Sequence, residues 1–189
     1  MTIANKLTLA RLIIIPVMVI AISVEGLKGR TYALDMHLGQ WAFAVLFVIA
    51  TLTDFLDGYI ARKYDQVTTF GKFLDPLADK VLVVVALLYL MASQPDRVPL
   101  WAVTVVIFRE FMVTGIRLLA VEKRVVIAAS PYGKAKTAVT MVALTLLLFN
   151  DLFLPVIVAD VLFWAAIVLT ALSGVDYAIK NRSIIFEAG

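Results

Sequence analysis

The sequence contains no cysteine and only one histidine, His37, among its 189 residues. The lack of cysteine excludes a disulfide framework, a thiol nucleophile and a zinc site built from thiolates. We expect His37 to lie in an external loop as a solvated residue rather than to act as a catalyst. A covalent intermediate on cysteine or histidine is therefore not the chemistry that we expect of this chain.

Charged residues are also scarce: they make up 16% of the chain, against 62% apolar residues and a mean hydropathy of +0.97. A soluble domain of this length would be nearer half apolar, so the composition predicts a membrane protein. The net charge is only +3, so the positions of the charges matter more than their sum, and we expect no nucleic-acid partner. The apolar run at residues 12–24 lacks a small-residue cleavage site, so we expect it to stay in the protein.

The apolar runs predict an all-α integral membrane protein with six transmembrane helices in a single domain, residues 1–189. A spanning helix needs roughly 20 mostly apolar residues, because the hydrocarbon core is about 30 Å thick and each residue rises about 1.5 Å. The predicted spans are about residues 7–24, 41–62, 73–92, 98–120, 134–150 and 155–178. No internal repeat or low-complexity segment is visible.

Lysine and arginine predict the orientation of these spans, because cytoplasmic loops are enriched in both. Thirteen of them would fall on one side of the membrane and three on the other. We therefore expect both termini to face the cytoplasm. The side with thirteen carries Lys6, Arg11, Arg62, Lys63, Lys72, Lys80, Arg117, Lys123, Arg124, Lys134, Lys136, Lys180 and Arg182, and the other carries Lys28, Arg30 and Arg97.

Four aspartates surround the short loop between the second and third predicted spans. Asp54 and Asp57 are separated as i and i+3, and Asp75 and Asp79 as i and i+4, so each pair would share one helix face. The loop of residues 62–72 joins two antiparallel helices, so the pairs can converge near the inner edge of the membrane. Gly58 follows on the same stripe as Asp54 and, like other small residues, would leave room for a ligand.

Carboxylates at this depth need a counter-charge, because an aspartate at the centre of a spanning helix costs about 2.5–3.5 kcal/mol. Two divalent cations, Mg²⁺ or Mn²⁺, would remove that cost and the mutual repulsion, since both prefer oxygen ligands. A pair of such ions can clamp a phosphoryl centre. The alternative is a set of helix-end carboxylates paired with nearby cations, namely Arg62, Lys63, Lys72 and Lys80.

The stretch from Asp54 to Asp79 resembles the CDP-alcohol phosphotransferase family. It matches the family pattern D-x2-D-G-x2-A-R-x8-G-x3-D-x3-D at every fixed position. The matching residues are Asp54, Asp57, Gly58, Ala61, Arg62, Gly71, Asp75 and Asp79. Eight fixed positions at fixed gaps make a chance match improbable, and members of that family have six spans.

The resemblance implies a role for most of these residues. The four aspartates would hold two divalent metal ions, and Asp79 would also take the proton from the attacking hydroxyl. Gly71 would allow a close backbone approach. The residues that would contact the cytidine diphosphate lipid are Asn5, Thr8, Gly58, Ala61, Arg62, Thr68 and Gly71. The resemblance also implies a homodimer in the bacterial cytoplasmic membrane with its active site on the cytoplasmic side.

Segments outside the motif resemble the bacterial phosphatidylglycerophosphate synthases within this family. They are residues 5–11, Arg109-Glu110, Arg117 and residues 133–137. Arg109 and Arg117 are eight residues apart, about two helical turns, and so point to similar sides of one helix. With Lys134 and Lys136, they favour a phosphorylated acceptor. The implied reaction transfers a phosphatidyl group from CDP-diacylglycerol to glycerol 3-phosphate.

Several alternatives remain open on the sequence alone. The acceptor could be inositol phosphate or phosphatidylglycerol, and an acidic cluster among six spans also allows a divalent-cation transporter or a structural partner protein. Arg109 could form a buried pair with Glu110 or with an acid of another helix, while Arg117, Lys134 and Lys136 could be ordinary cytoplasmic anchors. Asn5 and Thr8 could instead cap the first helix.

Overall fold

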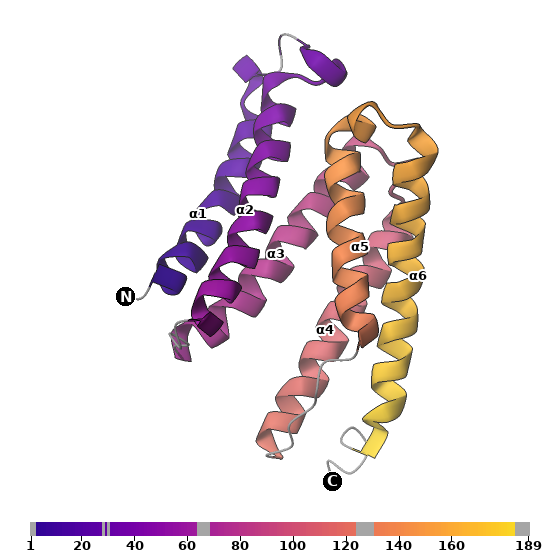
Figure 1. Ribbon diagram of the computed structural model, residues 1–189. Coiled ribbons are helices and arrows are strands. Elements are labelled where there is room, and N and C mark those ends of the chain that lie inside the picture. Colours follow the sequence, from indigo (N-terminus) through magenta and orange to yellow (C-terminus); the bar gives the residue numbers. More distant parts are fainter. Residues whose placement is uncertain (1–2, 28, 30, 64–68, 124–130, 184–189) are drawn as a thin grey trace. The chain divides into compact units, whose positions relative to one another are not determined.

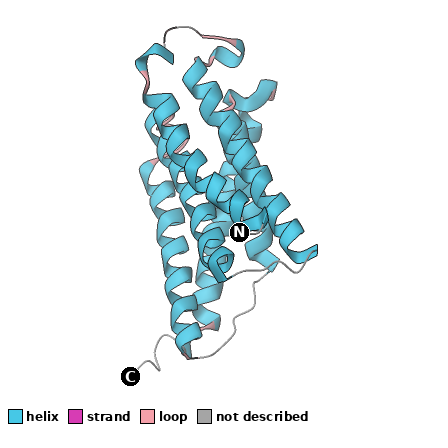
Figure 2. Ribbon diagram, turned by 90° about the vertical axis from the view of Figure 1, so that its left-hand side faces the viewer, coloured by secondary structure: helices cyan, strands magenta, loops and turns pink. Residues whose placement is uncertain are grey.

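The computed structural model describes residues 3–27, 29, 31–63, 69–123 and 131–183, which form helices joined by loops, with one isolated β-bridge between Thr31 and His37 (Figure 2). This confirms the predicted all-α class for the described residues, and one long helix lies over each predicted span. The long helices are α1 (Ile3–Ser23), α2 (Leu38–Lys63), α3 (Thr69–Ser93), α4 (Leu100–Glu122), α5 (Pro131–Leu148) and α6 (Val156–Lys180). Three short 3-10 turns are η1 (Glu25–Leu27), η2 (Ala33–Asp35) and η3 (Asn150–Phe153).

Most of the helices extend past the apolar stretches that predicted them. Helix α3 begins at Thr69, so Gly71 lies in its first turn and not in the predicted loop. Helix α1 begins at Ile3, so Thr8 lies inside it and the alternative that Thr8 caps this helix is wrong. The reason is that hydropathy detects only the apolar part of a helix, whereas backbone hydrogen bonding continues into polar turns. Helix α5 starts at Pro131, because proline suits the first helical position.

Among the described residues, α6 is the one helix that is long and apolar enough by itself to cross a membrane. Its most apolar window has a mean hydropathy of 2.3. Shorter apolar stretches cover Leu7–Ser23, Leu38–Asp54 and Ala135–Leu148. The number of crossings and the side of each terminus stay predictions.

The chain divides into two compact units, and the predicted single domain stays a prediction. The first unit comprises Met1–Leu90 and Leu144–Pro155, and the second comprises Met91–Ala143 and Val156–Gly189. In the first unit, α1 and α2 lie side by side (Figure 1). The two helices approach closely at Gly39, where an added Cβ would lie 2.7 Å from the carbonyl oxygen of Ala21. Only glycine fits this crossing without a shift of one helix.

His37 caps the start of α2 and is not simply a solvated loop residue as predicted. The backbone N–H of Gln40 donates to His37 Nδ1 at 3.2 Å, and the backbone N–H of His37 donates to Gln40 Oε1 at 2.9 Å. This is the reciprocal arrangement of a capping box, with histidine in the place of serine or threonine. The sequence reasoning missed it because histidine is not among the residues preferred at N-caps.

The turns of the first unit are joined by hydrogen bonds and an aromatic contact. Asn150 Nδ2 donates to the carbonyl oxygen of Leu34 at 2.9 Å, which links η3 to η2. Trp41 Nε1 donates to the carbonyl oxygen of Ala33 at 3.1 Å, and its ring meets Phe149 edge-on at 5.4 Å. The polar tip of this tryptophan is therefore satisfied by the chain itself.

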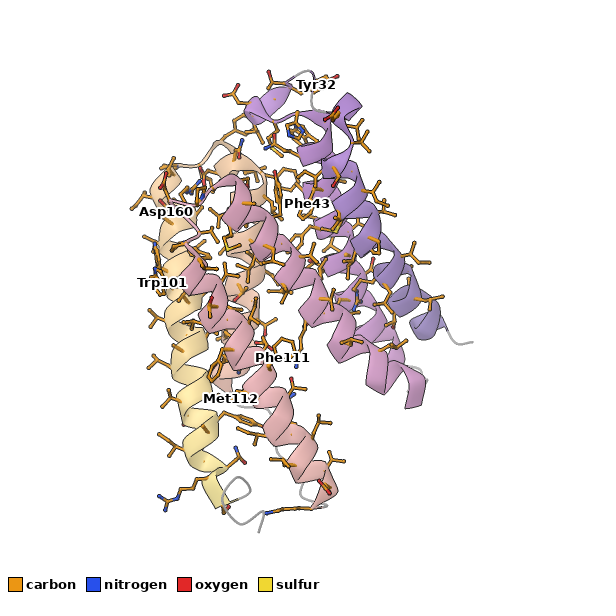
Figure 3. All side chains as sticks on the ribbon, turned by 180° about the vertical axis from the view of Figure 1, so that it is seen from behind. Tyr32, Phe43, Trp101, Phe111, Met112 and Asp160 are labelled. Atoms are coloured by element: carbon orange, nitrogen blue, oxygen red, sulfur yellow. The ribbon has the colours of Figure 1, made fainter. Side chains whose placement is uncertain are left out.

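In the second unit, α4 and α6 lie side by side (Figure 1). Trp101 stacks on Trp164 with ring centroids 5.3 Å apart. Near the start of both helices, Arg97 forms an ion pair with Asp160 at 2.7 Å (Trp101 and Asp160 are labelled in Figure 3). These contacts hold the two helices together at their N-terminal ends, and Arg109 and Arg117 contact α6 further along α4.

Candidate active site

The aspartate motif lies on α2 and α3, and both helices run unbroken through it. Helix α2 extends to Lys63, so residues 54 and 57 keep the helical i, i+3 spacing that the sequence prediction required. Helix α3 covers Thr69–Ser93, so residues 75 and 79 keep the i, i+4 spacing. Each pair of positions therefore lies on one helical stripe.

The two helices of the motif contact each other at the ends that lie away from the motif. Phe43, near the start of α2, and Tyr89, near the end of α3, have ring centroids 4.5 Å apart. This contact requires α2 and α3 to run antiparallel. The end of α2 and the start of α3 are joined by five residues, 64–68. The covalent connection therefore keeps the two aspartate pairs at the same end of the hairpin.

Asp54 is paired with a buried arginine from the neighbouring helix. Arg11 Nη1 on α1 lies 2.6 Å from Asp54 Oδ1. The Arg11 side chain has no exposed surface, whereas the Asp54 side chain is 39% exposed. Arg11 thus orients one carboxylate oxygen from the protein side while the rest of the group remains accessible. The sequence analysis used Arg11 to orient the spans and as the last residue of the resembling segment 5–11, and assigned it no role in the site. The signal that could have found it is its position one helical turn after Thr8, a residue already predicted to contact the lipid.

The structure describes the side chains of only part of the predicted site. Asp54 and Asp79 are partly buried, and Thr8 is buried. Thr68 lies outside the described residues. For the remaining predicted motif and nucleotide residues the backbone is helical and the side chains lie outside the described part: Asn5, Asp57, Gly58, Ala61, Arg62, Gly71 and Asp75. Among the described side chains, which include only Asp54 and Asp79 of the four aspartates, no group of three or more His, Cys, Asp or Glu could hold a metal ion.

A second polar cluster lies in the second unit, where α4 meets α5. Glu110 Oε1 accepts a hydrogen bond from Arg109 Nη1 at 2.9 Å and another from Lys136 Nζ. The side chains of Arg109, Glu110 and Lys136 are only 12%, 15% and 10% exposed. The structure thus brings together two of the four predicted acceptor cations, and it also shows the pair of Arg109 with Glu110 that the sequence left open as an alternative. The fourth cation, Lys134, has its backbone in α5 and its side chain outside the described residues.

Helix α6 contacts both arginines of α4, which confirms that they point to similar sides of that helix. Arg117 Nε donates to the Tyr177 hydroxyl at 3.3 Å, and its guanidinium carbon lies 5.8 Å from the centre of that ring. One turn before Tyr177, a Cβ added to Gly174 would lie 2.8 Å from Arg109 Cγ. Gly174 therefore leaves the space into which the aliphatic part of Arg109 packs.

The helical fold, the apolar α6 and the aspartate motif fit a membrane-associated transferase, and the family follows from comparison with known proteins. The family model for CDP-alcohol phosphatidyltransferase matches residues 1–172. The match covers most of the chain, including both helices of the aspartate motif. The chain belongs to the CDP-alcohol phosphatidyltransferase family, as its motif predicts.

Curated relatives point to one branch of this family. The CDP-diacylglycerol–glycerol-3-phosphate 3-phosphatidyltransferase of Bacillus subtilis is 44% identical over 182 residues, which cover 94% of this chain and 93% of the relative. The enzyme of the same name from Rickettsia bellii is 38% identical and covers 92% of this chain and 91% of its own length. A probable phosphatidylglycerophosphate synthase of Mycobacterium tuberculosis is 42% identical and covers 94% of this chain and 80% of the relative.

Proposed function

We propose that this protein transfers the phosphatidyl group of CDP-diacylglycerol to sn-glycerol 3-phosphate, giving phosphatidylglycerophosphate and CMP. The observation that carries the proposal is the 44% identity, over 94% of the chain, to a relative whose name states this reaction. The complete aspartate motif on two unbroken helices supports the same chemistry. The basic cluster around Arg109 and Lys136 supports a phosphorylated acceptor.

The enzyme would work as an integral protein of the bacterial cytoplasmic membrane. Six helices cross the bilayer in this proposal, with both termini and the active site on the cytoplasmic side. Two observations support it: the thirteen-to-three distribution of lysine and arginine, and the length and hydropathy of α6. The substrates match this location, because CDP-diacylglycerol is a membrane lipid and glycerol 3-phosphate is water-soluble.

The aspartates have the chemistry to hold divalent metal ions. Carboxylate oxygens are the ligands that Mg²⁺ and Mn²⁺ prefer, and the Asp54 carboxylate is accessible and held by Arg11 at one oxygen. In the proposal, Asp54, Asp57, Asp75 and Asp79 hold two such ions. When bound, the ions supply positive charge that stabilises the pyrophosphate and the leaving CMP.

The transfer needs one proton acceptor and one displacement at phosphorus. In the proposal, Asp79 removes the proton from the primary hydroxyl of glycerol 3-phosphate as that oxygen attacks the phosphorus bearing the diacylglycerol. The new phosphorus–oxygen bond forms as the bond to the CMP oxygen breaks, and CMP leaves with that electron pair. The nucleotide end is contacted by the residues that the family motif assigns: Asn5, Thr8, Gly58, Ala61, Arg62, Thr68 and Gly71.

The phosphate of the acceptor is the charged group that the second cluster would bind. Its proposed partners are the cations on α4 and α5, namely Arg109, Arg117, Lys134 and Lys136. Tyr177 and Gly174 on α6 support this role, because they position the two arginines. The oligomer in the proposal is a homodimer, for which the family resemblance is the support.

The test is CMP release from CDP-diacylglycerol by the purified full-length protein, with and without glycerol 3-phosphate and Mg²⁺. Release should require both additions, and a panel containing inositol phosphate and phosphatidylglycerol should leave glycerol 3-phosphate as the preferred acceptor. Release that needs no acceptor or no metal would reject the proposal.

Asp79→Asn should reduce CMP release at least about 100-fold, because general-base catalysis typically contributes 10²–10⁴-fold. The variant keeps the size of the side chain and removes the base. Asp96→Asn is the matched control, since Asp96 lies exposed in the turn before α4 and the same substitution there should leave the rate unchanged. Equal rates for both variants would contradict the role of Asp79.

A further inference from the structure

Glu110 is a partly buried acid that the proposed reaction does not use, although it contacts two of the cations proposed for the acceptor's phosphate. Its Oε1 accepts hydrogen bonds from Arg109 Nη1 and from Lys136 Nζ. We propose that Glu110 is a positioning residue that occupies these donors as a resident anion and weakens the binding of the acceptor's phosphate. This inference rests on the proposed function.

The charges of the cluster do not cancel, so the cluster is a partly neutralised anion-binding site rather than a balanced ion pair. Two cations and one carboxylate leave a net charge of +1 among three side chains that are at most 15% exposed. In addition, Arg109 Nε is buried and has no hydrogen-bond partner among the described residues. A buried donor without a partner is costly, and an anionic oxygen would satisfy it.

The guanidinium of Arg109 is held in place, so a ligand must come to it. Its Cγ lies where a side chain at position 174 would otherwise be, since an added Cβ at Gly174 would approach it to 2.8 Å. Lys136 has a flexible stem and can change partners, whereas Arg109 is fixed by packing on α6 and by its bond to Glu110. An incoming phosphate would therefore compete with Glu110 mainly for the Lys136 ammonium group.

A reason for such a competitor follows from the reaction itself. The phosphate of glycerol 3-phosphate is not altered by the transfer and is still present in phosphatidylglycerophosphate. The enzyme therefore binds this group equally tightly in substrate and product. Such binding lowers the KM without raising kcat, and it slows the release of the product. A carboxylate close to the phosphate weakens this binding, because like charges repel strongly where water is scarce.

Glu110→Gln in the full-length enzyme tests the inference. The amide keeps the shape of the side chain and raises the charge of the cluster from +1 to +2. We expect the KM for glycerol 3-phosphate to fall about tenfold, which corresponds to about 1.4 kcal/mol of removed repulsion. Inorganic phosphate should inhibit at a correspondingly lower concentration, the KM for CDP-diacylglycerol should not change, and kcat should not rise.

Asp176→Asn is the matched control. It removes the same charge from an acid on α6 that pairs with Lys180 at 2.9 Å, but both side chains are exposed to a much greater degree, 35% and 63%. Both KM values should stay at the wild-type level in this variant. A fall in the KM for glycerol 3-phosphate here as large as in Glu110→Gln would overturn the inference, because the effect would then be one of overall charge.

The result that overturns the resident-anion role is an unchanged or raised KM for glycerol 3-phosphate in a Glu110→Gln enzyme with the wild-type melting temperature. If that variant is too unstable to assay, Glu110→Asp decides instead. The shorter side chain keeps the charge but places the carboxylate further from Lys136. A lowered KM for glycerol 3-phosphate therefore supports the inference, and an unchanged or raised KM overturns it. A wild-type enzyme that releases CMP without glycerol 3-phosphate would instead reject the proposed function.

Discussion

At the scale of single residues, Arg11 connects the packing of α1 to the candidate active site. It is fully buried in the first unit and lies 2.6 Å from the first aspartate of the motif. A guanidinium cannot lose its charge at any ordinary pH, so it needs a lasting anionic partner when it is buried. Asp54 fulfils that need while remaining accessible to a ligand, which couples the packing of α1 to the geometry of the site.

Arg11→Met should lower the free energy of unfolding by about 1–3 kcal/mol, because it removes the charge partner of a partly buried carboxylate. Methionine roughly replaces the buried aliphatic part of arginine, so the loss reports mainly on the charge. SDS titration of the purified protein, followed by circular dichroism, measures the change. Arg11→Lys keeps the charge and should lose less. Equal stability of the wild type and Arg11→Met would show that the pair does not matter for folding.

Shared helix faces could be predicted from the sequence where they depend on spacing along one helix. The i, i+3 and i, i+4 aspartates and the eight-residue separation of Arg109 and Arg117 are of this kind, and the helical backbone bears out the spacing. The partners of Arg11 and Lys136 could not be predicted from the sequence, because each partner lies on a different helix from the residue that it contacts. Which side chains meet across helices depends on how each helix is rotated about its axis.

At the scale of elements, α2 depends on an unusual cap. His37 and Gln40 satisfy each other's backbone N–H groups at its first turn. The helix has 26 residues, about 39 Å, and its last ten residues, 54–63, carry the first half of the aspartate motif. The cap and the motif thus lie at opposite ends of one rigid element.

His37→Ala should lower the free energy of unfolding by about 1 kcal/mol, the usual cost of losing a side-chain N-cap. His37→Asn should keep most of the stability, because its carbonyl oxygen can accept the Gln40 N–H in place of Nδ1. Thermal unfolding of the purified variants measures both. A loss for His37→Asn as large as that for His37→Ala would argue against the capping role.

Two glycines offer a contrasting pair of tests of helix packing. Gly39→Ala places a methyl group 2.7 Å from a backbone oxygen of α1, which cannot move without shifting the helix, so we expect a loss of about 1–3 kcal/mol. Gly115→Ala on α4 meets no atom within 4 Å and should gain up to about 1 kcal/mol from the better helix propensity of alanine. Unfolding of the two variants under the same conditions should therefore shift in opposite directions.

At the scale of the whole molecule, the proposed orientation can be tested because the chain has no cysteine of its own. Asp96→Cys lies in the turn between α3 and α4, and Ser183→Cys lies just after α6. In intact cells, a membrane-impermeant maleimide should label Asp96→Cys and leave Ser183→Cys unlabelled until the cells are opened. Labelling of both variants in intact cells, or of Ser183→Cys alone, would contradict six crossings with cytoplasmic termini.

The sequence by itself was enough to determine the helical class, the approximate position of each long helix, the aspartate motif and the family. These properties follow from hydropathy and spacing, which are local and survive any packing of the helices. Only the tertiary structure decided that Arg11 pairs with Asp54, that Glu110 lies between Arg109 and Lys136, and that His37 caps α2. Each of these contacts depends on the reach of particular side chains and on the relative rotation of neighbouring segments. Neither quantity can be deduced from a periodic pattern along the chain.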